Sequence, residues 1–558
     1  MTRRRPHLAL ACLALPQFVW AHTLQEQVIL PAPAPQLAHA PLSTSVFSGT
    51  QLDRYGVDSA GELSVRAPAL ASDRAGSILR IRGVGATQSS PVAVFLDDVY
   101  VGDLGFTDAA NYFDLESVEV IRGPQGMRSG FNALGGVINL RSAAPSPTWQ
   151  SKVVAELGSD DYRALQGLIR GPITDQFYMS VAGSTLARSR VRAAAPGQDG
   201  GALDNQYLRG AFSYHWNNLW YSTLQGSSAD TADGRLETAL LVNEVALGAY
   251  RVKYLGSWYS RDRIQEKERG RSHTVQVYSD LSGPVNFDAG LVYRDSEREQ
   301  ADSPRAPERD SLAAWTDLRW SLAPVLELQA GLRYSDEQGQ DPAAPWGAPD
   351  ADYWDWRVSL DYQWRDQLFY ASTSTGHGSG PREQGGAIAT PDNRLLAFEI
   401  GHRAHFLQQR LQTAVSLFRY ELDQFAQGAG SAHGLEAEAS WAVNDTLTLG
   451  GSWAHNDGHL PGPRQQLALF GSARWQWRWA AMEALLQFLY SDAACPCQDL
   501  SARQWDASIS AGYGLWRLTA YVDNLADEQS AGQPDPPELT GPYADYPRSF
   551  GLRLSYRL

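Results

Sequence analysis

Side chains that commonly act as nucleophiles, bases or metal ligands are scattered through this sequence. Its 11 histidines include one close pair, His402 and His405. We expect this pair to lie on a strand, where an offset of three residues places the two rings on opposite faces. No Gly-x-Ser-x-Gly elbow, phosphate-binding Gly-Lys-Ser/Thr loop, His-Glu-x-x-His helix or dinucleotide fingerprint is present. The sequence therefore predicts no catalytic residue, no metal site and no cofactor, and we expect a protein that is not an enzyme.

Thiol chemistry is confined to one short segment of the mature chain. Cys495 and Cys497 are separated only by Pro496. In an oxidising compartment they could form a disulfide, although so short a loop would be strained. Two free thiols are the other reading that this spacing leaves open, and a metal site would need a second Cys or His pair nearby.

Two regions of different character would have to position any functional side chain. Residues 42–144 offer two short helix signals, followed by short β segments that glycines separate. From residue 145 to the end the chain repeats alternating stretches joined by Gly, Asp, Asn and Pro turns. Leu326 to Tyr334 alternates in this way, and so does the terminal stretch from Phe550 to Leu558. We expect a small α/β domain followed by a large all-β domain.

The composition points to a membrane β-barrel for the second region. The chain has 18 Trp, 24 Tyr and 17 Phe, yet its mean hydropathy is only -0.35. A barrel gives this combination because only every second residue of each strand meets lipid. A soluble β-sandwich or propeller also alternates, but here the alternation runs for about 400 residues without the regular repeat that a propeller would show. The formal net charge of -15 disfavours nucleic acid as a partner.

The N-terminus has the features of an export signal. Residues 1–21 combine three arginines, an apolar stretch that contains Cys12, and the small-residue cleavage site Val19-Trp20-Ala21. Residues 22–41 are rich in Ala and Pro, which favours an extended linker. We expect a cleaved signal peptide and then a flexible tail.

Four fragments follow one another between residues 80 and 144: Ile81-Arg82-Gly83, Val94–Tyr100, Ser117–Gly126 and Asn132–Leu140. In order and spacing they resemble the plug-domain signature of TonB-dependent receptors of the bacterial outer membrane. Later segments are similar to barrel segments of the family, among them Phe398-Glu-Ile-Gly401, Gly434-Leu-Glu-Ala-Glu438 and Tyr546–Leu558.

This resemblance implies an all-β membrane protein: an antiparallel transmembrane β-barrel of about 22 strands (residues 145–558), occluded by a small N-terminal α/β plug domain (residues 42–144). The barrel region holds 414 residues (558 − 145 + 1). That leaves ~19 residues for each strand with its connection, and a membrane strand needs ~9–11 of them. The connections should therefore be short and the ligand vestibule shallow or narrow.

The resemblance also assigns roles to particular residues. The stretch Glu26, Gln27, Val28, Ile29, Leu30, Pro31 and Ala32 resembles a TonB box, the extended segment that the periplasmic TonB protein captures by strand addition. The alternative is a linker with an incidental apolar triplet. By analogy with the family, Arg82, Glu119 and Arg122 should form ionic contacts between plug and barrel, and Gln88, Phe106 and Tyr112 should contact ligand from outward-facing plug loops.

The function implied is TonB-dependent import of a scarce ligand, such as a ferric siderophore or a similar metal chelate. The partners would be TonB with its inner-membrane energy complex, outer-membrane lipid and lipopolysaccharide, and the small-molecule ligand. Alternatives are a receptor for cobalamin or oligosaccharide, and a passive channel or surface-binding barrel without energy coupling. Which ligand is imported does not follow from the sequence.

Overall fold

The computed structural model describes residues 42–72, 79–84, 92–102, 112–130, 133–188, 203–231, 234–263, 266–300, 308–340, 351–378, 393–425, 428–458, 460, 463–492, 502–528 and 548–558. The predicted signal peptide, tail and TonB box lie outside these residues. So do Gln88, Phe106, Cys495 and Cys497. None of the helices among the described residues is long and apolar enough to cross a membrane.

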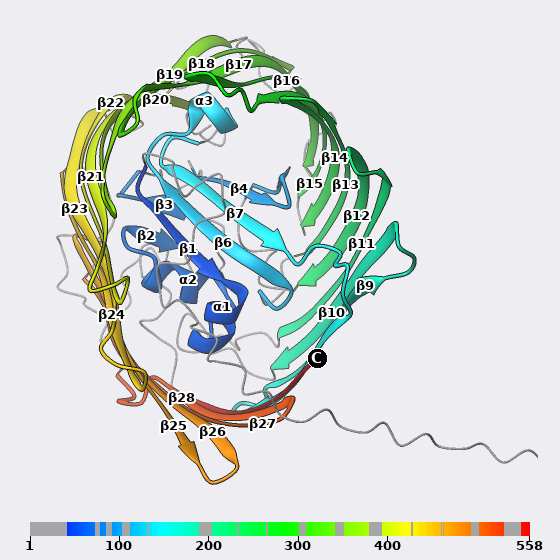
Figure 1. Ribbon diagram of the computed structural model, residues 1–558, viewed down its shortest axis with the longest axis vertical. Helices are drawn as coiled ribbons and strands as arrows, with labels where there is room; N and C mark the ends of the chain where they lie inside the picture. The colour runs from blue at the N-terminus through cyan, green and yellow to red at the C-terminus, as the bar shows by residue number, and fades with distance from the viewer. Residues whose placement is uncertain are drawn as a thin grey trace, which may run out of the picture.

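Twenty-two strands, β8 to β29, form a closed barrel, as predicted (Figure 1). Each strand pairs antiparallel with its neighbours in the chain, and β29 closes the ring against β8. The strands are β8 Gln150–Gly158, β9 Arg163–Pro172, β10 Phe177–Arg188, β11 Leu203–Asn217, β12 Trp220–Thr231, β13 Gly234–Leu247, β14 Tyr250–Arg263, β15 Glu266–Ser279, β16 Val285–Gln300, β17 Glu308–Ala323, β18 Leu326–Gln340, β19 Ala351–Trp364, β20 Gln367–Gly378, β21 Asn393–Phe406, β22 Leu411–Phe425, β23 Gly428–Ala442, β24 Leu447–Gly458, β25 Gln465–Trp477, β26 Ala480–Ser491, β27 Ala502–Tyr513, β28 Trp516–Asp523 and β29 Ser549–Arg557.

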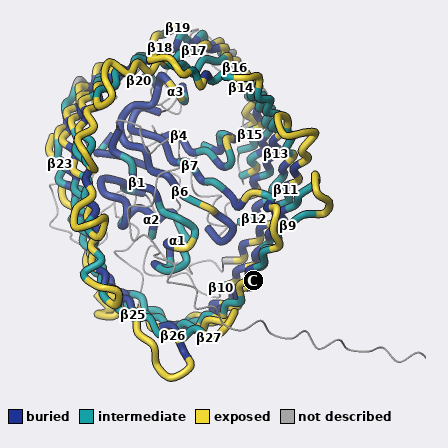
Figure 2. Tube along the Cα trace, viewed as in Figure 1, coloured by how far each residue is buried: buried dark blue, intermediate teal, exposed yellow. Residues whose placement is uncertain are grey.

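The period-2 pattern of the strands separates a lipid face from an inner face. On β18, Leu332 is 43% exposed on the outside, whereas Gln329 and Arg333 point inward and are each 4% exposed. Inward polar side chains are buried here because a second domain fills the bore (Figure 2). The alternation that predicted the strands therefore also sorts lipid contacts from plug contacts.

One rim of the barrel carries exposed tryptophans beside its short turns, which we call the short-turn rim. They flank turns such as Asn218–Leu219, between β11 and β12, and Gly514–Leu515, between β27 and β28. Exposed members of this belt are Trp216, Trp220, Trp320, Trp364, Trp441, Trp477 and Trp516. Indole rings favour the boundary between hydrocarbon and headgroups, so this belt marks one membrane interface.

The plug domain lies inside the ring of strands (Figure 1). Its five-stranded sheet has the order β1-β6-β7-β4-β5, and β2 pairs with β3. The elements are β1 Thr44–Ser48, α1 Gly49–Tyr55, α2 Ala60–Arg66, β2 Leu70–Ser72, β3 Leu79–Ile81, β4 Val92–Leu96, β5 Val99–Tyr100, β6 Leu115–Arg122, α3 Gly126–Ser129 and β7 Gly136–Ser142. Almost all of it is buried (Figure 2).

Local signals explain how the plug begins. Ser48 caps α1 by accepting from the Gln51 backbone, and the Gln51 side chain accepts from the Ser48 backbone in return, which completes a capping box. Gly56 ends the helix with a φ of 67°, a conformation that glycine adopts without strain. Beyond these ends, α1 packs against β1 and β6, and α2 contacts β25 and β26 of the barrel wall.

Candidate functional site

Arg82 joins the plug to the inner wall of the barrel. It directly follows β3, and its Nη1 lies 2.6 Å from Glu399 Oε2 on β21. Its Nε lies 2.7 Å from Glu436 Oε1 on β23, and Nη1 also donates to the Tyr420 hydroxyl at 2.7 Å. The side chain is fully enclosed, with a relative exposure of 0%. The structure thus brings Arg82 to the barrel, where the resemblance placed it.

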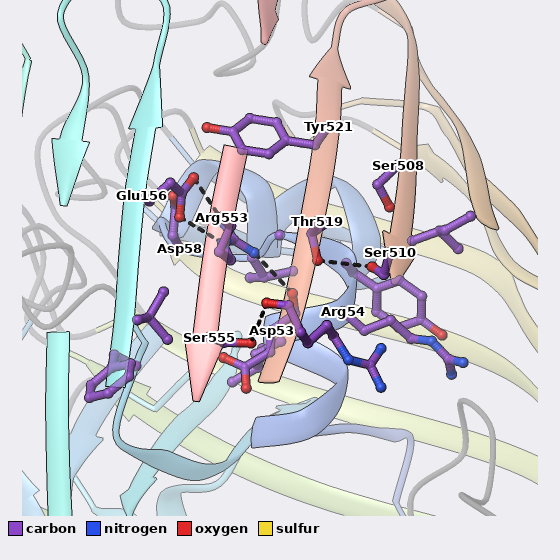
Figure 3. A pocket seen from close by; sticks show the side chains of 18 of the residues that line it. Asp53, Arg54, Asp58, Glu156, Ser508, Ser510, Thr519, Tyr521, Arg553 and Ser555 are labelled. Carbon is purple, nitrogen blue, oxygen red and sulfur yellow. Dashed lines mark hydrogen bonds and ion pairs between the residues drawn. The ribbon is translucent and has the colours of Figure 1, made fainter. Parts of the chain in front are cut away.

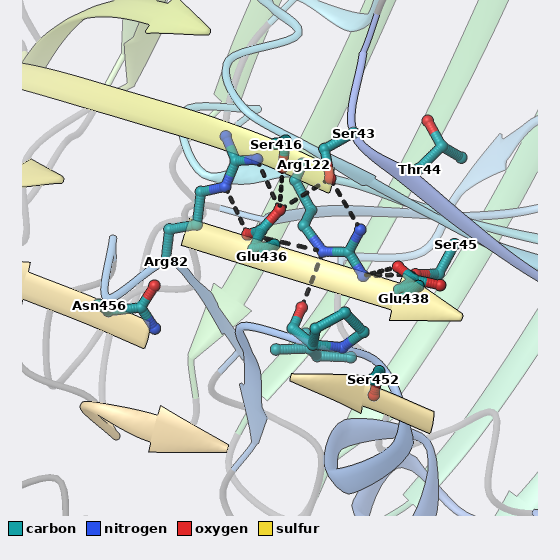
Figure 4. A network of polar contacts seen from close by, with 12 residues as sticks. Ser43, Thr44, Ser45, Arg82, Arg122, Ser416, Glu436, Glu438, Ser452 and Asn456 are labelled. Atoms are coloured by element: carbon teal, nitrogen blue, oxygen red, sulfur yellow. Dashed lines mark hydrogen bonds and ion pairs between the residues drawn. The ribbon is translucent and has the colours of Figure 1, made fainter. Parts of the chain in front are cut away.

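Arg122, at the end of β6, reaches β23, one of the strands that Arg82 contacts (Figure 4). Its Nη2 lies 3.3 Å from Glu438 Oε1, and its Nε lies 3.9 Å from Glu436 Oε1. Within the plug, its Nε donates to the Pro68 carbonyl at 2.7 Å. Arg122 therefore ties two parts of the plug to one glutamate pair on β23.

The first residues of the plug take part in the same contacts. The Ser43 backbone N–H donates to Glu399 at 2.8 Å, and the Ser43 hydroxyl donates to Glu436 at 2.8 Å. The Ser45 hydroxyl bonds Glu438. We call the set Ser43, Ser45, Arg82, Arg122, Glu399, Glu436 and Glu438 the anchor network.

The anchor network pairs buried charges of opposite sign, with one carboxylate more than its guanidinium groups. Burial opposes the charge on Arg82, but the Glu399 and Glu436 carboxylates outweigh it and raise the pKa of Arg82 well above its ordinary value. Two guanidinium groups meet three carboxylates, and serine hydroxyls occupy further oxygen positions. Buried ions are tolerated only with such partners, and removing one partner typically costs about 3–5 kcal/mol.

Aromatic rings cover the anchor network on its barrel side. The Arg82 guanidinium lies 4.1 Å from the centroid of the Phe418 ring. The Tyr370 hydroxyl donates to Glu399 at 2.7 Å. Phe418 and Tyr420 belong to an apolar cluster that includes Val84 and Leu134 of the plug. Exclusion of water strengthens each ionic contact inside the network.

Glu119 differs from its predicted role as a plug–barrel contact. It lies on β6 opposite Asn139 of β7, and its side chain contacts residues of the plug's own sheet. Its Oε1 is 3.4 Å from Arg141 Nε, and its Oε2 accepts from Asn139 at 3.3 Å. Glu119 and Arg122 are separated by an odd number of residues along β6. Successive side chains of a strand point to opposite faces, so these two lie on different faces of the sheet.

A second plug–barrel contact was not predicted. Arg209 on β11 lies between two plug carboxylates, with Nη1 3.4 Å from Asp114 and Nε 3.6 Å from Asp97. Burial raises the pKa of Asp114 to about 6, against the opposing effect of Arg209. On β14, Lys253 lies 3.3 Å from Asp98 and holds the pKa of that carboxyl below its usual value, although burial acts the other way.

Tyr112 also differs from its predicted role as a ligand contact. Tyr112 was expected on an outward-facing loop, but it is only 2% exposed and packs in the apolar core of the plug with Leu115 and Val118. Its backbone has a φ of 51°, which turns the chain inward just before β6. Direct contact between the Tyr112 ring and a ligand does not fit this position.

The wall residues of the anchor network were missed because nothing in the local sequence pairs them with the plug. Glu399 and Glu436 lie more than 300 residues after Arg82 in the sequence. A usable signal was present: each is a carboxylate on the inner face of a strand, between outward residues such as Phe398 and Ile400, which are 45% and 55% exposed. An inward charge in a barrel needs a partner from whatever fills the bore.

Comparison with known proteins gives two family matches. Residues 36–137 match the model described as TonB-dependent receptor plug domain. Residues 148–525 match the model described as TonB-dependent receptor-like β-barrel.

Individual relatives are distant. The chain is 24% identical over 555 residues to the pesticin receptor of Yersinia pestis, covering 82% of this chain and 81% of that protein. It is 22% identical over 314 residues to a vitamin B12 transporter of Vibrio vulnificus, covering 54% and 48%.

Solved structures share the fold. The ferric yersiniabactin uptake receptor of Yersinia pestis superposes with a TM-score of 0.77 at 18% identity, covering 93% of this chain and 98% of that one. The siderophore receptor PiuA of Acinetobacter baumannii gives a TM-score of 0.76 at 13% identity, covering 93% and 97%.

Proposed function

Because this chain belongs to the TonB-dependent receptor family, and is therefore an outer-membrane receptor rather than an enzyme, we propose that it imports a ferric siderophore or a similar metal chelate with energy supplied through TonB. The observation that carries the proposal is the anchor network, in which Arg82 and Arg122 hold the plug against the wall. Buried ion pairs of this kind hold the plug in the bore and can be broken when the plug is displaced.

The choice of ligand class rests on what similar proteins are named for. The solved structures named above include a ferric yersiniabactin uptake receptor and a siderophore receptor. Relatives named as vitamin B12 transporters match a shorter part of the chain. A ferric chelate is therefore the ligand we propose, and cobalamin is the alternative that the test includes. Gln88 and Phe106 remain our candidates for ligand contact.

Energy coupling is proposed to enter at residues 26–32. The test is uptake by cells that express the full chain, a variant lacking residues 26–32, or a control variant lacking the seven residues 34–40. The probes are ⁵⁵Fe loaded onto catecholate, hydroxamate and phenolate siderophores, and ⁵⁷Co-cyanocobalamin. We expect concentrative uptake of at least one iron chelate by the full chain and by the control, and loss of uptake without residues 26–32.

Two results would contradict the proposal. Accumulation of cobalamin alone would show that the imported ligand is cobalamin rather than an iron chelate. Uptake of the iron probes that survives deletion of residues 26–32, or that only equilibrates across the membrane, would indicate a barrel without energy coupling.

A further inference from the structure

A groove of about 490 Å³ lies on the lipid-facing surface of the barrel, over β19–β22. Its lining comes from two rows of outward residues that lie directly opposite each other on neighbouring strands. One row runs from Leu360 to Leu417, and the other runs from Val358 to Arg419. The large apolar residues of both rows are 40–55% exposed, so they point to lipid. We call this hollow the lipid-face groove.

The groove exists because β20 carries short side chains on its lipid face. Ala371 and Thr373 form the floor, between Leu360 on β19 and Phe398 and Ile400 on β21. The Thr373 hydroxyl is enclosed, so the floor presents methyl groups rather than a polar atom. A trough with a low floor and with branched or aromatic walls can contact a hydrocarbon chain on three sides.

The position of the groove along the membrane normal follows from β22. The outward residues of this strand are uncharged from Leu411 to Leu417, and the first outward charge is Arg419. Leu411 lies opposite Trp441 of the short-turn rim. From Leu411 to Arg419 the strand rises roughly 26 Å at ~3.3 Å per residue, or about 20 Å of membrane depth at a tilt of ~40°. Short turns of such barrels face the periplasm, and the apolar band is ~25 Å tall. Arg419 therefore lies near the headgroups of the outer leaflet.

Arg419 can bind an anionic headgroup from this position. Its Nη2 pairs with Glu421 at 3.0 Å, but the two side chains are 67% and 47% exposed, and such a pair contributes little. The planar guanidinium has five N–H donors and matches two phosphate oxygens at once. His433 of β23, directly opposite Arg419, is exposed and adds a further ring N–H. The outer end of the groove is therefore suited to a phosphate group.

The groove and Arg419 together match one kind of occupant. At ~30 Å³ for a water-sized group, the 490 Å³ of the groove holds roughly 16 methylene groups, which is one fatty acyl chain. A chain in the trough with a phosphate at its outer end belongs to a phosphorylated lipid of the outer leaflet. In a bacterial outer membrane that lipid is lipid A, the anchor of lipopolysaccharide. Lipid tails gain no hydrophobic stabilisation by moving between apolar surfaces, so binding rests on packing along the trough and on the contact between Arg419 and phosphate.

The lipid-face groove lies directly behind the anchor network. In Phe398–Ile400 of β21, the first and last side chains line the groove, and Glu399 between them binds Arg82. In Leu417–Arg419 of β22, Phe418 points inward, and its ring lies 4.1 Å from the Arg82 guanidinium. One layer of backbone therefore separates the two sites. A chain packed into the groove restrains the strands that carry Glu399 and Phe418.

The plug is held differently at the part of the wall formed by β26–β29 and β8 (Figure 3). There a cavity of about 1010 Å³ lies between the wall and the helices α1 and α2. Arg553 donates to the Asp53 carbonyl at 3.2 Å, and Arg54 pairs with Glu483. These contacts share no strand with the lipid-face groove, so α1 provides an internal control for any effect of lipid on the plug.

We propose that the lipid-face groove binds one acyl chain of a lipid A molecule while Arg419 pairs with a phosphate of the same lipid, and that this lipid stabilises the wall behind the anchor network. The site acts on the resting receptor. It takes part neither in ligand recognition nor in coupling to TonB, so it is independent of the import function proposed above.

Binding is measured by native mass spectrometry on the purified, delipidated full chain in detergent, with bisphosphorylated lipid A and phosphatidylglycerol as probes. We expect lipid A to bind at least fivefold more tightly, because it carries two phosphates and more acyl chains. Ala371→Leu fills the floor of the groove, and Arg419→Ala removes the phosphate contact. Each variant should weaken lipid A binding at least fivefold.

The matched controls lie on the lipid face outside the groove. Ala314→Leu changes an exposed outward alanine of β17, which lies opposite Leu291. Arg271→Ala removes an outward arginine of β15 whose side chain is 66% exposed and paired with Asp295. Both controls should change lipid A binding less than twofold.

Hydrogen exchange tests the link to the anchor network. With saturating lipid A, we expect exchange to slow at least threefold in β1 and around Arg82, and to stay unchanged in α1. The Ala371→Leu variant should not show this slowing.

Three results would overturn the proposal. Equal binding of lipid A to the groove variants and their controls would indicate an unspecific belt of lipid. Phosphatidylglycerol that binds as tightly as lipid A would exclude lipid A as the specific occupant. Lipid A that binds the groove without slowing exchange in β1 would break the link to the anchor network. Because neither TonB nor a metal chelate is present, none of these results bears on active import.

Discussion

Tyr370 on β20 lies directly opposite Gly401 on β21, and its ring occupies the space that a side chain at position 401 would need. A Cβ on Gly401 would lie 2.2 Å from the ring. The same ring carries the hydroxyl that donates to Glu399 of the anchor network at 2.7 Å. The pairing of an aromatic residue with a cross-strand glycine recurs in the barrel at Tyr259 with Gly270, Phe418 with Gly434, Phe470 with Gly450 and Tyr521 with Gly551.

Gly401→Ala should destabilise the receptor by about 1–3 kcal/mol, because the added methyl group forces the Tyr370 ring to move. The displaced hydroxyl would also leave Glu399. The measurement is the thermal unfolding of the detergent-solubilised protein. Gly167→Ala on β9 is the matched control, since a Cβ there meets nothing within 4 Å, and its midpoint should be unchanged or higher. Equal effects of the two substitutions would contradict this reading.

Arg82→Ala should cost about 3–5 kcal/mol, because Glu399 and Glu436 keep their burial but lose their main counter-charge. We expect faster proteolysis of the plug and reduced uptake of the imported probe. Arg235→Ala is the control: its ion pair with Asp230 is about half exposed on both sides, so its loss should change stability by less than about 1 kcal/mol. An Arg82 variant as protease-resistant as the control would refute the anchoring role.

Glu119→Gln and Glu436→Gln separate the two roles that sequence reasoning had merged. Both changes keep shape and remove one negative charge. Glu436 holds plug to wall, so its variant should expose β1 and the segment around Arg82 to hydrogen exchange. Glu119 accepts from Asn139 and pairs with Arg141, both on β7, so its variant should affect exchange on β6 and β7 alone. Matching exchange patterns in the two variants would show that Glu119 also acts at the wall.

The stability of the plug should depend on Asp114 between pH 4 and 7. Its pKa rises from 3.8 to about 6 on folding, so the folded state binds the proton more tightly. Stability then falls as pH rises through this window, by up to about 3 kcal/mol at 1.36 kcal/mol per pKa unit. At pH 4, the Asp114→Asn variant should be as stable as the natural chain or less stable. Toward pH 7, the stability of the variant relative to the natural chain should increase. A constant difference in unfolding midpoint between the two proteins across this range would contradict the assignment.

Much of the architecture followed from local pattern. The alternation seen at Leu326–Tyr334 marks β18, and it is predictable because lipid on one side of each strand imposes period 2 on the sequence. The number of strands, 22, came from the family resemblance, and the length of the barrel region was compatible with it. The plug signature around Arg82 likewise located the residue that contacts the wall.

The partners of those residues were less predictable. Glu399, Glu436 and Arg209 lie far from the plug in the sequence, and only the closed ring brings them to it. Tyr112 was misplaced because a glycine-rich plug loop and a turn into the core have the same composition. Glu119 was misplaced because family analogy gave it a role that the strand face it occupies does not allow.

The plug begins inside its own anchor. Ser43 directly precedes β1 and bonds both Glu399 and Glu436, while its carbonyl accepts from the Arg122 backbone at 2.9 Å. Any tension applied to the chain ahead of Leu42 is therefore delivered first to these bonds, before it reaches the sheet. A force on the N-terminal segment therefore acts directly on the anchor network. Such a force breaks the contacts between plug and wall before it unfolds the plug's own sheet.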